Sequence, residues 1–130
     1  MTNPILNWRK VAVTAGDGDI VIQLTGNADT ELSTRYFWMP SAEGQVELQT
    51  DRRDGEPLTV SMSALTGQLD KLGFVFNAAP LVAGRLDLVA TVRIVQLNSP
   101  QVLLEELIQL SLSAAGKFIQ YADGVQFVRS

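Results

Sequence analysis

The segment from Gly84 to Leu97 carries the longest strand pattern in the sequence. Its apolar residues recur with period two, and charged or polar residues occupy most of the positions between them. Because successive side chains of a strand point to opposite faces, this alternation predicts a β strand with one buried face. A strand longer than the usual length of about 5 or 6 residues is typical of a sandwich or barrel, across which it bends. The residues of its apolar face are Leu86, Leu88, Ala90, Val92 and Ile94.

Shorter strand patterns recur between turn signals along most of the chain. Alternation predicts strands at 20–25 and 58–64, and each run is bounded by glycine, asparagine or similar turn residues. Leu72, Phe74 and Phe76 fit a further strand that follows a turn. A short helix that ends at Gly73 is an alternative for this segment, because leucines also recur there at helical spacing.

The period of the apolar residues changes after Ser99-Pro100. Serine is a good helix N-cap, and proline is favoured at the first helical position. From there to Gly116, apolar residues at helical spacing cover an arc of roughly 200°, which is wider than the stripe of about 100° that a surface helix needs. This pattern predicts one amphipathic helix, and its width indicates that the helix is covered on two sides.

After the predicted helix, the apolar runs 118–121 and 125–128 flank Ala122-Asp123-Gly124. Asp-Gly between two apolar runs predicts a β hairpin. The whole sequence, residues 1–130, is therefore expected to be a single β-rich domain. The expected fold is an antiparallel β sandwich or partly open barrel with one C-terminal amphipathic helix followed by a hairpin. Alternation is the same in both architectures and leaves the choice between them open.

The composition restricts the chemistry that this chain can perform. It contains neither cysteine nor histidine, so thiolate nucleophiles and histidine-based hydrolase triads are excluded and a catalytic zinc site is not expected. We expect no enzymatic activity, no cofactor and no metal. Fourteen acidic residues leave a carboxylate pair open in principle. Calcium binding by two acidic loops also stays open, although turn chemistry explains their composition. These loops contain Asp17 and Asp19, and Asp51, Asp54 and Glu56.

The net charge of −4 and the scattered basic residues give no basic face for nucleic acid. No segment approaches the roughly 20 apolar residues of a membrane helix, and no secretory signal is visible at the start. The expectation is a soluble protein, cytoplasmic or released without a signal peptide, that binds neither nucleic acid nor membranes.

Tyr36 to Met39 form the densest aromatic cluster in the chain. In an extended conformation both faces of this segment are apolar, so one face enters the core and the other needs a cover. The predicted helix also has a wider apolar surface than one contact can cover. We therefore predict a self-associating or complex-forming structural subunit, because interfaces are enriched in Trp, Tyr and Met. The predicted interface residues are Tyr36, Phe37, Trp38, Met39, Leu103, Leu104, Leu107 and Ile108.

A ligand-binding sandwich or barrel is the alternative function. A small apolar molecule or a carbohydrate would contact exposed aromatic rings, and Trp8, Tyr36 and Trp38 are the candidates for such contacts. Oligomeric state separates the two hypotheses, because the first requires a second chain and the second does not.

Overall fold

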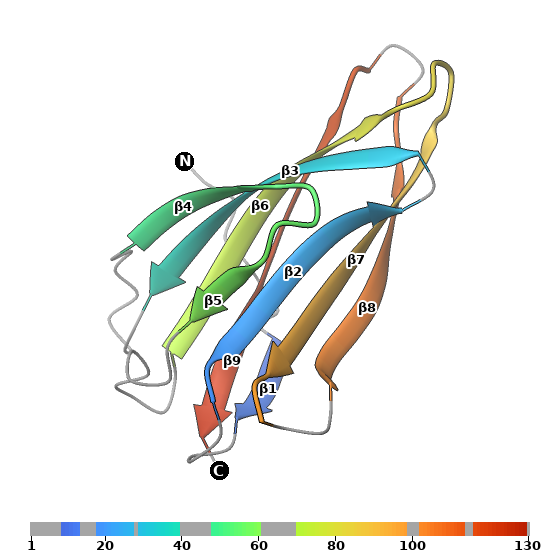
Figure 1. Cartoon of the computed structure of the whole chain (residues 1–130). Helices are drawn as coiled ribbons and strands as arrows, with labels where there is room; N and C mark the ends of the chain where they lie inside the picture. Colours follow the sequence, from blue (N-terminus) through green and yellow to red (C-terminus); the bar gives the residue numbers. More distant parts are fainter. Residues whose placement is uncertain are drawn as a thin grey trace.

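Nine strands form two β sheets in the described part of the chain (Figure 1). The structure is a computed structural model and describes residues 9–13, 18–27, 29–39, 48–60, 70–98, 102–113 and 116–129. The first sheet has the strand order β1-β9-β6-β3-β4, and the second has the order β5-β2-β7-β8. The strands span Arg9–Val13 (β1), Ile20–Asn27 (β2), Thr30–Met39 (β3), Leu48–Arg53 (β4), Leu58–Val60 (β5), Asp70–Pro80 (β6), Asp87–Gln96 (β7), Val102–Ser111 (β8) and Ile119–Arg129 (β9).

The chain passes repeatedly from one sheet to the other. Only β3 with β4, and β7 with β8, are consecutive strands that pair within one sheet. All of the described strand pairs are antiparallel except β1 with β9, which run parallel. The prediction of a mainly β fold is confirmed.

The two sheets pack face to face over one cluster of buried apolar side chains to which both contribute. On β2, Ile20, Ile22 and Leu24 are at most 1% exposed, and the side chains between them are only half-buried. The strand predicted at 72–76 is confirmed in β6, where Leu72, Phe74 and Phe76 enter the same core. Each fully buried side chain of this kind contributes about 1.5–3 kcal/mol relative to its exposed state.

Two predicted strands have different boundaries in the structure. The long one begins at Asp87 rather than near Gly84, because Gly84 has a φ of 84° in the turn that precedes it. Leu86 is 40% exposed and does not belong to the buried face. The strand predicted at 58–64 is described only as β5, and its second half lies outside the described residues.

The predicted C-terminal helix is wrong. Val102–Ser111 is strand β8, which pairs antiparallel with β7, and the predicted helix start at Ser99-Pro100 lies outside the described residues. Ile108 and Leu110 are buried, and the residue between them is exposed, as in a strand. Glu106 lies on the same inner face and interrupts the period-two alternation of apolar residues along the strand. The remaining apolar residues also fit a helical spacing, which explains why the sequence predicted a helix.

The predicted C-terminal hairpin is also wrong. Ala122-Asp123-Gly124 lies inside the continuous strand β9, in register with β6. Asp123 is only 7% exposed, and its carboxylate is held by Arg9 from β1 and by the Gly124 N–H. These partners hold an Asp-Gly sequence in extended conformation, although the same dipeptide usually forms a turn.

The connection between β4 and β5 joins the two sheets along one side. The Asp54 carboxylate accepts hydrogen bonds from the Gly26 N–H at 2.9 Å and from the Leu32 N–H at 3.3 Å. Gly55 has a φ of 75° and donates its own N–H to the Leu24 carbonyl at 3.0 Å. One carboxylate therefore fastens this corner to the ends of β2 and β3.

Replacement of Asp54 by alanine is expected to destabilise the protein by about 1–3 kcal/mol, because two partly buried N–H groups lose a charged acceptor. Chemical denaturation measures this change. The matched control is Asp51→Ala, which removes a more exposed carboxylate paired with Arg35 and should cost less than about 1 kcal/mol. Equal losses from the two variants would contradict the role given to Asp54.

Candidate interaction surface at strand β8

The edge strands of the two described sheets differ in how well they are protected from other chains. β1 has 5 residues and β5 has 3, while β4 has 6 and carries three consecutive charged side chains. Short length and charge are common means by which edge strands avoid unwanted pairing. β8 has 10 residues, is mostly apolar and contains neither proline nor lysine. Among the described edges, β8 is therefore the longest and the least protected.

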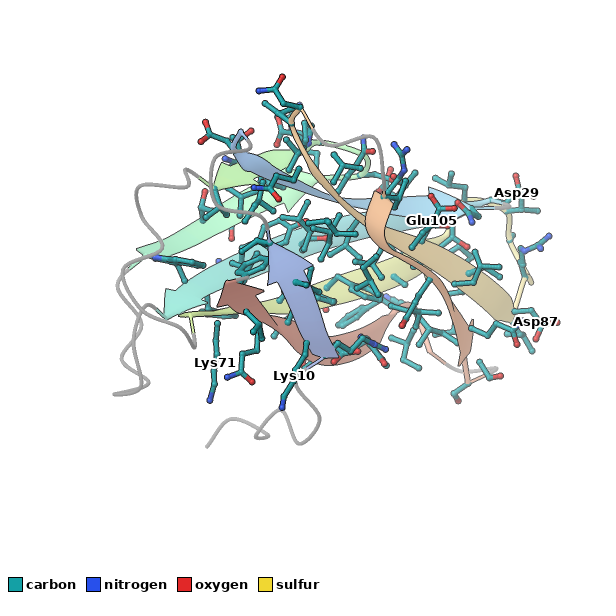
Figure 2. All side chains as sticks on the ribbon, turned by 90° about the horizontal axis from the view of Figure 1, so that it is seen from below. Lys10, Asp29, Lys71, Asp87 and Glu105 are labelled. Carbon is teal, nitrogen blue, oxygen red and sulfur yellow. The ribbon has the colours of Figure 1, made fainter. Side chains whose placement is uncertain are left out.

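The outer face of β8 presents Leu107 at the middle of the strand. This side chain is 64% exposed, the highest value among the large apolar side chains of the described residues. Beside it, Glu105 pairs with Arg93 of β7, with 3.1 Å between Oε2 and Nε. Figure 2 shows Glu105 on β8, on the other side of the molecule from Lys10 and Lys71. An apolar side chain with a polar surround is the composition of a small interface.

The inner face of β8 contains a carboxylate among apolar neighbours. Glu106 lies opposite Val92, which is fully buried. Its Oε2 accepts from the Arg9 Nε at 2.8 Å, and Arg9 comes from β1 of the other sheet. An inward-pointing charge is another means of protecting an edge strand. Arg9 neutralises this charge and joins the edges of the two sheets.

Arg9 also reaches the buried carboxylate of Asp123. That carboxylate accepts further hydrogen bonds from the Gly124 N–H at 2.8 Å and from the Tyr121 hydroxyl at 3.3 Å. Burial lowers the pKa of Arg9, because it disfavours the charged form. The carboxylates of Asp123 and Glu106 raise the pKa by more, so the pKa of Arg9 lies above its ordinary value. Burial and the Asp123 carboxylate raise the pKa of Tyr121, so its hydroxyl keeps its proton at neutral pH. The cluster is a satisfied ion-pair network.

The predicted interface residues do not form one surface. Tyr36 and Trp38 are 1% and 8% exposed and point between the sheets, whereas Phe37 is half-buried on the outer face of the first sheet. Met39 ends β3, and its side chain is outside the described part. The other four predicted residues lie on β8, in the second sheet, where Leu107 is exposed, Leu103 and Leu104 are half-buried and Ile108 is buried.

The aromatic rings considered for ligand binding lie in the core. Trp38 packs against Phe127 with ring centroids 6.2 Å apart, and Tyr36 packs edge-on against Phe74 at 6.4 Å. Both rings are therefore enclosed by the two sheets. Trp8, the third candidate, lies outside the described residues.

The acidic loops bring no three carboxylates together within the described residues. Asp54 accepts backbone N–H groups, Asp51 pairs with Arg35, and Glu56 accepts from the Arg53 N–H. Asp17 lies outside the described residues. The same part of the chain has no helix with the length and apolar character needed to cross a membrane.

Sequence reasoning did not find Arg9, Glu106 or Asp123 as interacting residues. Arg9 lies on the first described strand, whereas Glu106 and Asp123 lie on the last two. The available signal was a mismatch in two segments, because a glutamate interrupts the apolar alternation of 102–111 and an aspartate stands between two strand patterns.

No family model, curated protein or solved structure matches this chain. The function proposed for it therefore rests on the geometry of its own residues.

Replacement of Arg9 by methionine keeps most of the side-chain volume but leaves Asp123 buried without its cation. We expect a loss of about 2–4 kcal/mol in the free energy of unfolding, measured by urea denaturation. The control is Arg93→Met, which breaks the half-exposed pair with Glu105 and should cost less than about 1 kcal/mol. If Arg9→Met were as stable as the control, the network would not hold the two sheet edges together.

Proposed function

We propose that this chain is a non-catalytic β sandwich that self-associates, with β8 pairing antiparallel to β8 of a second copy. The length and apolar character of this edge support the proposal, because a long apolar edge can pair with another strand and Arg9 already neutralises the inward charge of Glu106. The pairing would extend the second sheet across both copies and would satisfy the outward backbone groups of β8.

The side chains of β8 favour one register for this pairing. With a two-fold axis at Leu107, this residue faces its own copy, and Glu105 faces Gln109 of the partner strand. A two-fold axis at Glu105 or Glu106 would instead place identical carboxylates opposite each other, which is destabilising. On the inner face, Glu106 would approach an apolar neighbour while it keeps its ion pair with Arg9.

Burial of Leu107 in both copies supplies a central apolar contact. A fully buried leucine contributes about 1.5–3 kcal/mol relative to an exposed one, and backbone hydrogen bonds along the strand add to this. Association through an exposed sheet edge is a common mode of protein recognition.

Replacement of Leu107 by glutamate is expected to dissociate the oligomer, because the register places the new carboxylate opposite its own copy. The dissociation constant should rise at least about a hundredfold, since each tenfold change corresponds to about 1.4 kcal/mol. Native mass spectrometry and light scattering over a concentration series measure it. The control is Leu81→Glu, at a loop leucine that is 62% exposed, and it should leave association unchanged.

Mixing Leu107→Glu with Leu107→Lys tests the register. Each variant should be monomeric alone, and the mixture should form a heterodimer because opposite charges then face each other across the axis. A wild-type chain that stays monomeric at high concentration, or an equal effect of Leu81→Glu, would refute the proposal.

A further inference from the structure

Four polar side chains form an array on the inner face of β3 and β4. Thr34 lies opposite Arg52 in the register of the two strands, and Tyr36 lies opposite Thr50. Directly opposite residues of antiparallel strands share one face of the sheet, so all four side chains point toward the second sheet. β3 and β4 lie on the side of the molecule that is joined by the β4–β5 corner (Figure 1).

Two hydroxyls in this array are buried and unpartnered. Thr34 is 3% exposed and Tyr36 is 1% exposed. Neither Thr34 Oγ1 nor the Tyr36 hydroxyl has a hydrogen-bond partner within the described structure. Burial of such a group without a partner costs about 1–3 kcal/mol, so two of them on the inner face of one strand favour a bound partner. Burial also raises the pKa of Tyr36 in spite of the nearby Arg52, so the phenol keeps its proton and is a donor.

The guanidinium of Arg52 adds positive charge to the same place. Its described hydrogen bonds go to neutral oxygens, namely the carbonyls of Pro57 and Asp51 and the Thr50 hydroxyl. By contrast, Arg9, Arg35, Arg85 and Arg93 each pair with a carboxylate. Arg52 is therefore a cation whose charge is not matched by a carboxylate among the described residues.

We propose that Thr34, Tyr36 and Arg52 form a binding site for a small inorganic anion of about the size of chloride. The two hydroxyls and the guanidinium supply N–H and O–H donors and positive charge, which are the groups that bind anions. The almost complete burial of both hydroxyls excludes a ligand of many atoms. Arg52 is partly exposed at the β4 edge and marks the side from which the anion enters.

Chloride serves as the probe in thermal unfolding experiments, with gluconate at equal concentration as the comparison anion that is too large for the site. The midpoint of wild-type unfolding should rise with chloride by more than it does with gluconate. Once the site is saturated, each further tenfold increase in chloride adds about 1.4 kcal/mol, which raises the midpoint by a few degrees in a chain of this size.

Removal of one donor at a time tests the assignment. Tyr36→Phe, Thr34→Val and Arg52→Met should each abolish the excess response to chloride, with the fold checked by circular dichroism in gluconate. Tyr36→Phe removes a single oxygen and should be at least as stable in gluconate as the wild type, because it removes a buried hydroxyl that has no partner there. Arg93→Met, which alters a paired surface arginine, should keep the full response. Leu107→Glu should keep it too, which separates the anion site from self-association.

Three outcomes would overturn the anion site. The first is an equal response of the wild type to chloride and gluconate. The second is a response to chloride that persists in Tyr36→Phe and Arg52→Met. The third is a crystal grown in bromide that shows no anomalous peak beside the Tyr36 hydroxyl. A peak within hydrogen-bonding distance of Tyr36 and Arg52 would establish the site directly.

Discussion

The ion pairs of Arg9 link the two sheets at the edges formed by β1 and β8. Arg9 stands on β1, a five-residue strand that pairs in parallel with β9 and buries Val11 and Val13 in the core. Its guanidinium binds Asp123 of the neighbouring strand and Glu106 of the opposite sheet. Both carboxylates lie on faces that otherwise carry apolar side chains, and they are tolerated there because the cation matches their charge. Arg9 therefore connects β1 to both β8 and β9 through its side chain.

The same interaction explains why two sequence predictions failed. The inner strands could be predicted, because the alternation of Ile20, Ile22 and Leu24, or of the residues of β7, depends only on the core they face. Glu106 and Asp123 instead occupy inner positions because a residue about a hundred positions away neutralises them. Local periodicity contains no trace of such a partner, so Glu106 made β8 resemble a helix and Asp123 made β9 resemble a hairpin.

Four of the residues predicted at an interface lie on β8, but the sequence placed them on the wrong kind of element. The apolar arc after Ser99-Pro100 predicted a helix covered on two sides, whereas 102–111 is an edge strand with one buried and one exposed face. Leu107 is accordingly uncovered in the structure. The aromatic segment was harder to judge, because the sequence does not show which face of a strand lies inward. Tyr36 and Trp38 prove to be the buried pair, and Phe37 alone of the three rings faces outward.

Among the described residues, the two sides of the core differ in whether their buried polar groups have hydrogen-bond partners. At the β1 side, the carboxylate of Asp123 has donors from a guanidinium, a backbone N–H and a phenol. At the β4 side, the hydroxyls of Thr34 and Tyr36 are as deeply buried but have no partner in the described structure. Partner groups are normally found for buried polar atoms. The full satisfaction of Asp123, together with the two unpartnered hydroxyls on the face shared with Arg52, is the contrast from which we propose the anion site.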